Sequence, residues 1–365
     1  MIELLQGAIT IVLFFVILGG LVLLHEIGHF VTARLAKVRV LEFGIGFPPR
    51  ARVLKRGGET LYTLNWLPIG GFVKLEGEDG DDPDDPRSFS SQRLPTKLII
   101  LVAGVVMNLL VSFVIFTGIA LVGEPGVGVK FDTVVAGSPA ASAGLRPGDA
   151  IVAVDGEPYS AFEMRFPTDD LRDKAGQSVV LGILRADGTT EEVTVTLRVP
   201  TEANPGALGI TDLSGIQTGT VGYGFGEALS LGADRTVAAF GMILNGLADL
   251  GRSIVTDPTT APPAAGPVGI AVQLGDVLWT LGPLYVIYVT GLLSANLALV
   301  NILPFPPLDG GRMLMLVLKA LPGGSRISLR AEQLTYFVGF IALFTFLIWI
   351  TVFDVGRLLG GGGTP

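Results

Sequence analysis

Long apolar runs alternate with polar segments along the chain. Ile9–Leu24 is apolar throughout, and this run continues past a charged interruption to about Ala33. Further runs cover Leu98–Val122, which holds no charged residue, Trp279–Leu303 and Tyr336–Phe353. A bilayer core of about 30 Å needs roughly 20 apolar residues in a helix. The pattern therefore predicts a polytopic α-helical membrane protein with about four transmembrane helices.

The first apolar run also has the length of a secretory signal peptide, which is the alternative interpretation. However, no basic segment precedes it, and Glu3 stands where Lys or Arg would be expected. We therefore expect this helix to be retained.

The segments between the apolar runs predict strands and one amphipathic helix. Residues 38–76 alternate apolar and polar positions around Gly57-Gly58, which is typical of a β-hairpin, here next to the membrane. Residues 126–199 contain β-rich runs broken by turn residues, and Ser138-Pro139 begins a short helix. Apolar positions in residues 225–255 indicate a helix that lies at the membrane interface, although a spanning helix stays open.

These patterns together predict an order of segments. They are a first transmembrane helix (1–37), a β-loop region (38–97), a second transmembrane helix (98–122), an inserted β-rich domain (126–199), an interfacial helix (225–255), a third transmembrane helix with the LDGG motif that follows it (279–311), and a fourth transmembrane helix (336–355).

Charge distribution orients the predicted helices. Cytoplasmic loops of membrane proteins carry an excess of Lys and Arg. Residues 34–56 and 312–330 are rich in Lys and Arg, whereas the long stretch between the second and third helices is rich in Asp and Glu. We therefore expect the β-loop region on the cytoplasmic side, and both termini and the 126–199 domain on the opposite side.

Composition narrows the possible functions. Only 16% of the residues are charged, whereas a soluble domain carries about a quarter. The net charge of -8 argues against a nucleic-acid partner, because phosphate binding needs a basic surface. The chain has no cysteine, which excludes disulfides, thiolate metal sites and a thiol nucleophile. It has two histidines, and they are four positions apart.

The two histidines belong to the motif His25-Glu26-Ile27-Gly28-His29 inside the first apolar run. Helix positions i and i+4 share a face, so both imidazoles can reach one metal ion. Glu26 between them can then act as general base toward a water molecule beside the metal. The alternative is a pair of histidines packed in a core, but ionisable residues inside an apolar span are costly and mark functional sites.

A catalytic zinc ion usually has three protein ligands and one open position. Since there is no other His and no Cys, the third ligand must be Asp or Glu. Asp309 is the candidate, because it follows the third apolar run within Asn301–Gly311, where prolines break the helix. Irregular backbone at membrane depth occurs only where it is buried in protein or lines a wet cavity. The alternative role for Asp309 is that of a helix N-cap before Gly310.

With these motifs the chain resembles the site-2 proteases, and most closely the bacterial regulator of sigma-E protease group. The HExxH helix and "NILPFPPLDGG" carry the resemblance, and "GPVGIA" at Gly266–Ala271 is similar to the family as well. The resemblance implies an intramembrane Zn²⁺ metalloprotease of the bacterial inner membrane that cuts single-pass membrane proteins within the lipid bilayer. It implies zinc ligation by His25, His29 and Asp309, with Glu26 as base. It further implies that Asn301, and with less support Asn296, place the substrate or the developing oxyanion.

The β-rich domain at 126–199 resembles a PDZ domain, chiefly through Gly144-Leu145-Arg146-Pro147-Gly148-Asp149. PDZ domains bind extended peptides at a sheet edge. The domain could equally be a spacer that restricts access to the membrane portion. Some relatives carry two tandem PDZ domains, whereas one is found here.

Rival functions predict other features. An HExxH protease of another family would take a downstream glutamate as third ligand. A scaffold with a peptide-binding domain would not need Glu26, and a metal transporter would carry polar residues along several spans. The polar residues of Leu98–Val122 are only Asn108, Ser112 and Thr117, which argues against a transporter. An anti-sigma factor or a signal-peptide remnant could be the substrate.

Overall fold

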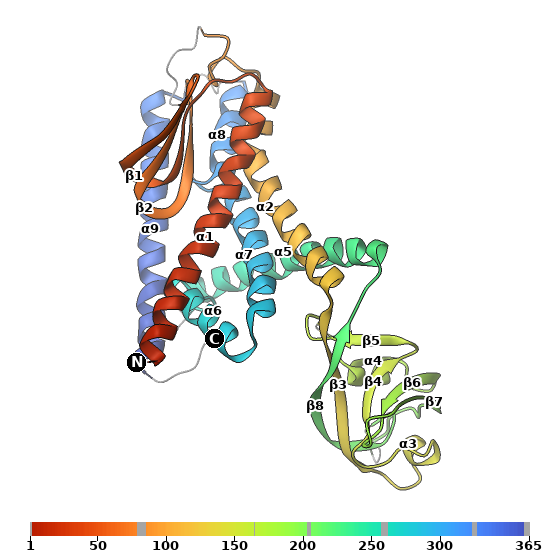
Figure 1. The fold of residues 1–365 in the computed structure, drawn as a ribbon. Helices are drawn as coiled ribbons and strands as arrows, with labels where there is room; N and C mark the ends of the chain where they lie inside the picture. The colour runs from red at the N-terminus through yellow and green to blue at the C-terminus, as the bar shows by residue number, and fades with distance from the viewer. Residues whose placement is uncertain are drawn as a thin grey trace. The chain divides into compact units, whose positions relative to one another are not determined.

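The computed structural model describes residues 2–78, 85–163, 165–202, 206–256, 262–322 and 327–360. The chain forms two compact units, shown as a ribbon in Figure 1. Unit 1 comprises Met1–Thr117 and Ser230–Pro365, and unit 2 comprises Gly118–Leu229. Unit 1 contains helices and a hairpin, and unit 2 contains a β-sheet with short helices.

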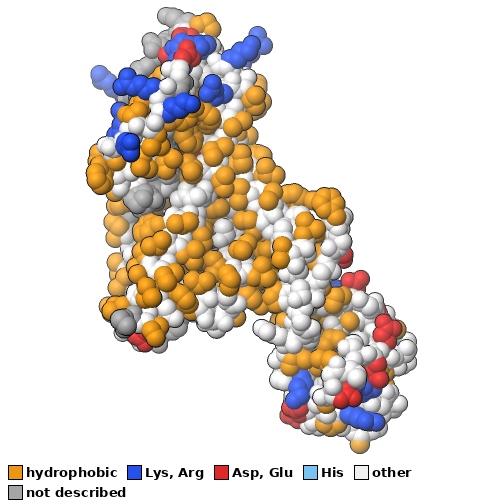
Figure 2. Space-filling view, viewed as in Figure 1, with side chains coloured by type: hydrophobic (Ala, Val, Ile, Leu, Met, Phe, Trp, Pro, Cys, Tyr) orange, Lys and Arg blue, Asp and Glu red, His pale blue; other side chains and the backbone are white. Residues whose placement is uncertain are grey.

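Within the described ranges, four helices are long and apolar enough to cross a membrane. They are α1 (Ile2–Leu35), α2 (Leu94–Val122), α7 (Pro283–Ile302) and α9 (Leu329–Leu359). Each corresponds to one of the four predicted apolar runs. Hydrophobic side chains cover the middle of unit 1, while Lys and Arg gather at the end that carries the hairpin (Figure 2). The start of α1 and the end of α9 lie at the other end (Figure 1).

The segment predicted to hold the third transmembrane helix and the LDGG motif, 279–311, is divided near its start in the structure. Helix α6 (Pro267–Thr280) ends within its first two residues, and α7 begins only at Pro283. Gly282 between them has φ +98°, which a helix cannot accommodate. After α7 ends at Ile302, a proline-containing turn leads into α8 (Asp309–Ala320). The apolar run thus contains a break that hydropathy alone does not indicate.

Helix α5 (Phe225–Thr256) occupies the segment predicted to be amphipathic. It is not among the helices apolar enough to span a membrane. In Figure 1 its unit 1 portion runs across α2 rather than alongside it. The crossing is close because Gly232 has no side chain: a Cβ there would lie 2.0 Å from Oγ1 of Thr117. Further along, Ala239 packs with Phe116 and Ala295.

Strands β1 (Val40–Gly57) and β2 (Thr60–Leu75) form an antiparallel hairpin whose tight connection falls at the predicted position. Both strands are longer than the predicted short strands. Val40 pairs with Leu75 at the open end, and Gly57 pairs with Thr60 at the turn. Residues 42–45 lie beside both 71–74 and 61–64, so each strand bends back midway and the hairpin becomes a compact layer. Packing of β2 on α1 places this layer beside the histidine helix.

Unit 2 is a six-stranded sheet in the order β7-β6-β4-β5-β3-β8. Its strands are β3 (Glu124–Val134), β4 (Ala150–Val154), β5 (Glu157–Ser160), β6 (Ser178–Leu184), β7 (Thr190–Thr196) and β8 (Ile210–Val221). Two short helices, α3 (Pro139–Ser142) and α4 (Pro167–Asp173), accompany them. Phe131, Ile151 and Leu181 are fully buried in its core. The unit extends beyond the predicted 126–199 range, because β8 pairs along most of β3.

Candidate metal centre

The histidine face of α1 packs directly on the backbone of α2. A Cβ on Gly28 would lie 2.5 Å from the carbonyl oxygen of Ala103, and one on Gly104 would lie 2.5 Å from Nε2 of His29. Glycine at both positions therefore allows the two helices to approach closely. As a result His25 and His29 are buried, with 6% and 8% of their surface exposed.

Asp309 enters the same space from the turn between α7 and α8. The two glycines that follow it let this turn fold tightly on itself. A Cβ on Gly310 would lie 2.1 Å from the carbonyl oxygen of Ile302, and one on Gly311 would lie 2.5 Å from the nitrogen of Pro306. Asp309 is the first residue of α8, and Leu308 precedes it as N-cap. The alternative in which Asp309 itself caps the helix is therefore not what the structure shows.

The three side chains predicted to bind zinc converge. Nε2 of His25 lies 2.9 Å from Oδ2 of Asp309, and Nε2 of His29 lies 3.2 Å from the same oxygen. The two Nε2 atoms are 3.1 Å apart. Ligands about 2.0–2.1 Å from a tetrahedral zinc ion are roughly 3.3 Å from each other. The triangle of ligand atoms therefore has the size of one face of a zinc tetrahedron, and its donors, two imidazoles and a carboxylate, are ones that zinc accepts.

Glu26 borders a cavity of about 190 Å³ together with His29 and Asp309. The opposite wall belongs to the hairpin and includes Phe47 and Phe72. Gly71 lets the hairpin come close to α1, because a Cβ there would lie 3.3 Å from Cδ1 of Leu23 and 3.7 Å from Cγ of Glu26. The cavity thus offers a carboxylate and a candidate metal centre in partly apolar surroundings.

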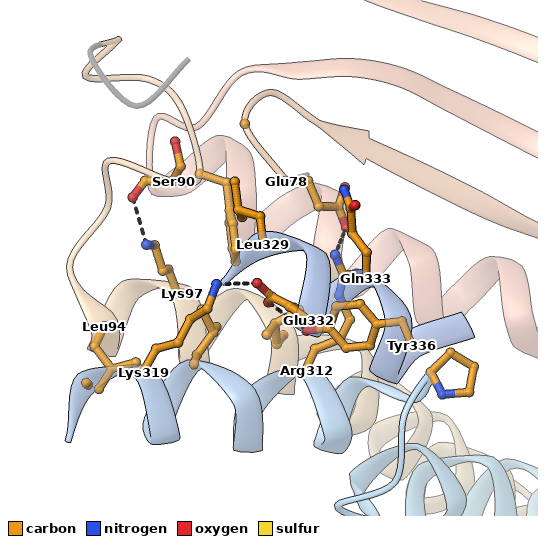
Figure 3. A pocket seen from close by; sticks show the side chains of 16 residues that line it. Glu78, Ser90, Leu94, Lys97, Arg312, Lys319, Leu329, Glu332, Gln333 and Tyr336 are labelled. Carbon is orange, nitrogen blue, oxygen red and sulfur yellow. Dashed lines mark hydrogen bonds and ion pairs between the residues drawn. The ribbon is translucent and has the colours of Figure 1, made fainter. Parts of the chain in front are cut away.

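A larger cavity of about 600 Å³ lies next to the first one, and the two share the lining residues Glu78, Leu101 and Arg312. Figure 3 shows its charged side chains: Arg312 of α8 pairs with Glu78 after β2, and Lys319 pairs with Glu332 of α9. Burial alone would lower the pKa of Arg312, but the Glu78 carboxylate raises it above its ordinary value. The Arg312 guanidinium therefore stays charged at the boundary between the two cavities.

Both asparagines predicted to contact the substrate are half-buried on α7. They lie on different faces, because an α-helix turns about 100° per residue. Asn301 follows Ser294 by two turns and shares its face, and Ser294 bonds to the backbone of α2. Asn296 lies roughly 160° away from Ser294 around the helix. The contacts of α7 therefore favour Asn301 over Asn296 as a residue near the histidines.

Sequence reasoning did not select the residues of α2 that surround the histidines. The carbonyl oxygen of Ile100 accepts a hydrogen bond from Nδ1 of His29 at 2.8 Å. Gly104 lies against both imidazoles, and the amide of Asn108 lies 3.4 Å from Nδ1 of His25. The sequence feature that could have indicated them is the four-residue spacing of Gly104 and Asn108, which places both on one helix face in a span without charged residues.

The fold and the centre together define a class of protein: a multi-pass membrane protein with the side chains of a metal-dependent hydrolase. The chain belongs to peptidase family M50, the site-2 proteases, whose sequence profile matches residues 13–346.

Relatives with zinc metalloprotease names cover almost the whole chain. One from Clostridium acetobutylicum is 31% identical over 352 residues, which are 95% of this chain and 97% of that protein. Zinc metalloprotease RasP of Shouchella clausii is 26% identical over 434 residues, with 96% and 99% covered. The chain is thus similar to membrane zinc metalloproteases, and the predicted enzyme class and zinc cofactor are confirmed.

Proposed function

We propose that this metalloprotease is an intramembrane zinc endopeptidase that hydrolyses peptide bonds in or near the transmembrane segments of membrane-anchored proteins. In this proposal His25, His29 and Asp309 hold zinc, Glu26 is the general base, and Asn301 contacts the substrate. An anti-sigma factor or a signal-peptide remnant is a substrate of the proposed class. The process would be regulated intramembrane proteolysis in the inner membrane of a bacterium.

One observation carries the proposal: two imidazoles and one carboxylate meet beside Glu26, on a helix that is long and apolar enough to cross a membrane. His25 is ten residues before the end of α1 at Leu35, which corresponds to about 15 Å along the helix. The centre therefore lies within an apolar span and can reach a peptide bond inside the bilayer. A peptide bond in a water-soluble protein would have to enter the apolar layer to reach this site, whereas one in a transmembrane segment is already there.

Each residue has a role that follows from its chemistry. A bound zinc ion supplies Lewis-acid chemistry, which polarises a carbonyl group and acidifies water. The Glu26 carboxylate takes the proton of the attacking water and delivers it to the nitrogen of the leaving amine. The amide of Asn301 donates a hydrogen bond to the carbonyl oxygen of the substrate as negative charge develops there. Phe47 and Phe72 line the cavity and make part of its wall apolar.

The larger cavity is proposed as the route by which water and the polar part of the substrate reach the smaller one. Its lining contains Lys97, Lys319 and Glu332 as well as the boundary pair of Glu78 and Arg312. Such a lining suits the polar residues that flank a transmembrane segment. It lies near the hairpin end, where Lys and Arg gather (Figure 2), and this supports a cytoplasmic position for that end.

Unit 2 is proposed to be a PDZ domain on the extracytoplasmic side. The stretch Gly144–Asp149 supports the proposal, since Gly144 and Gly148 adopt φ +73° and +91°, which favours glycine. Asp149 is buried and accepts a hydrogen bond from the N–H of Arg146 at 2.9 Å. A groove of about 490 Å³ lined by β3, β8 and residues near α4 could take an extended peptide.

The test is cleavage of a model transmembrane peptide by purified protein in liposomes. In Glu26→Gln we expect zinc content to stay the same and cleavage to fall by roughly 10²–10⁴-fold, the usual contribution of a general acid-base group. Glu3→Gln is the matched control, because Glu3 is an exposed carboxylate of the same helix. We expect it to cleave at the wild-type rate.

Cleavage by Glu26→Gln at the wild-type rate would remove Glu26 from the mechanism. Failure of the wild-type protein to cut any membrane-inserted peptide, while it cuts the same sequence in solution, would contradict the intramembrane substrate class.

A further inference from the structure

Helix α2 presents three residues at four-residue intervals to the two histidines: Ile100, Gly104 and Asn108. This spacing keeps the residues on one helix face. Ile100 contacts His29 through its carbonyl oxygen, and Gly104 leaves room for both rings. Asn108, the last of the three, lies at His25.

The amide of Asn108 is fully buried and has an unusual environment. Its Nδ2 faces Nδ1 of His25 at 3.4 Å. Its Oδ1 is buried without a hydrogen-bond partner in the described part of the chain. The backbone of α2 is held here by α7, because the Ser294 hydroxyl donates to the carbonyl oxygen of Asn108 at 2.7 Å. A buried polar atom without a partner costs free energy, so this arrangement requires an explanation.

The chemistry of a metal ligand supplies the explanation. An imidazole that binds a metal through Nε2 carries its proton on Nδ1, and a neighbouring oxygen normally accepts that proton. His29 follows this rule, since its Nδ1 donates to Ile100 at 2.8 Å. In His25 the corresponding N–H would meet Nδ2 of Asn108, which is also a donor.

A half-turn of the amide removes the conflict. The oxygen and nitrogen of an Asn side chain are nearly equal in shape, and their assignment follows from the hydrogen-bond network. The turned amide offers Oδ1 to His25 and directs Nδ2 elsewhere. Ser112, one helical turn further along α2, has a buried hydroxyl that also lacks a partner among the described residues.

We propose that Asn108 is the positioning residue of His25. Its side-chain carbonyl accepts a hydrogen bond from Nδ1–H, which selects the tautomer of His25 and aims Nε2 at the zinc ion. In this arrangement α2 supplies an oxygen to each histidine, a backbone carbonyl to His29 and a side-chain carbonyl to His25. The inference rests on the proposed role of His25 and His29 as zinc ligands.

The first measurement is zinc affinity of the full-length protein by competition with a chelator. Loss of such an outer partner typically costs 10–100-fold in metal affinity, and we expect this loss in Asn108→Ala. Asn108→Asp keeps an oxygen acceptor and should recover most of the affinity. Thr117→Val is the matched control, because it removes a different buried polar group of α2, a hydroxyl with no hydrogen-bond partner among the described residues, and it should bind zinc like the wild type.

The second measurement is spectroscopic and does not depend on activity. Since the chain contains two histidines, ¹⁵N-histidine labelling gives solid-state NMR signals from these two rings alone. In the zinc-loaded protein, Asn108→Ala should shift the Nδ1 signal of His25. The Nδ1 signal of His29 should stay in place, because its partner Ile100 is unchanged.

The outcomes separate this inference from the proposed function. Unchanged affinity and an unmoved His25 signal in Asn108→Ala would overturn the positioning role, as would equal shifts of both histidines, which indicate a packing role. Failure of Asn108→Asp to recover affinity would overturn it too. Full zinc binding by His25→Ala would instead overturn the proposed metal centre itself.

Discussion

Gly104 of α2 lies so close to His25 of α1 that a Cβ on the glycine would be 2.6 Å from Nε2 of the histidine. No real Cβ is tolerated at such a distance, so one of the two helices would have to move. The Nε2 atoms of His25 and His29 therefore lie against the backbone of α2 at Gly104 rather than against a side chain. The absence of a side chain at position 104 becomes a condition for metal binding.

The first prediction follows for Gly104→Ala. The added methyl group meets the two imidazoles directly, and overpacking of this kind costs typically 1–3 kcal/mol. We expect zinc affinity to fall by tenfold or more, measured by chelator competition. Gly118→Ala is the control on the same helix, because a Cβ there meets nothing within 4 Å, and it should retain full affinity. Equal behaviour of the two variants would show that the close approach has no role.

The second prediction concerns metal removal. The purified protein should hold about one zinc ion per chain, as expected for a single catalytic site, and His25→Ala, His29→Ala and Asp309→Ala should each hold less. Because a ligand that binds only the folded state stabilises it, a chelator should lower the thermal unfolding temperature of the wild type. It should have little effect on Asp309→Ala. Full zinc content in that variant would place the third ligand elsewhere.

Much of the membrane portion could be predicted from the sequence, because hydropathy and helix period act locally. The four spans and the shared face of His25 and His29 follow that logic. Asp309 lies 284 positions from His25 and was predicted from the need for a third ligand, although the use of these residues as ligands is still a prediction. The break at Gly282 depends on a single backbone angle within an apolar run. A hydropathy average over many residues does not detect the conformation of one residue.

Other contacts between distant segments could not be predicted from the sequence pattern. The approach of Gly104 to His25 depends on the packing of α2 against α1. Strand β8 of unit 2 pairs with β3, and the two are separated by most of that unit. Its exposed, weakly alternating residues carry little strand signal of their own. A strand of this kind can be recognised only when the strand that it pairs with is known.

The third prediction concerns Asp354 of α9, whose carboxylate accepts hydrogen bonds from the N–H groups of Gly266 and Gly269 at the start of α6, at 3.2 Å and 2.8 Å. Asp354 is buried, so Asp354→Ala leaves these donors without a partner. We expect a loss of roughly 1–3 kcal/mol in stability, measured as a lower unfolding temperature in detergent. Asp354→Asn keeps an acceptor and should lose less.

Asp276→Ala is the control for this substitution, since Asp276 is an exposed residue of α6. It should change stability by less than about 0.5 kcal/mol. If Asp354→Ala unfolded at the same temperature as this control, the contact between α9 and α6 would contribute nothing measurable to stability.

The fourth prediction concerns unit 2. Glu124 pairs with Val221 where the sheet begins and ends, so residues 124–221 can be replaced by a short glycine-serine linker between Gly123 and Gly222. We expect this variant to keep its zinc. If unit 2 is a size filter, the variant should cut a substrate with a large external domain faster than the full chain does. A substrate already trimmed externally should be cut equally by both.

The same experiment identifies a docking role. A variant that no longer cuts the trimmed substrate would show that unit 2 captures substrates. A bulky substrate that stays uncut, while the trimmed one is processed, would contradict the filter. We favour the filter, because both ends of unit 2 continue into helices of unit 1.

The sequence positions of the converging side chains also determine when the candidate metal centre can form during synthesis. His25 and His29 leave the ribosome early, whereas Asp309 follows only after three of the four candidate spans have been synthesised. A nascent chain that has inserted its first two spans holds two imidazoles and a glutamate but not the third candidate ligand. The candidate metal centre therefore cannot be complete, and the protein cannot hydrolyse a peptide bond with it, until three of the four candidate spans have been synthesised.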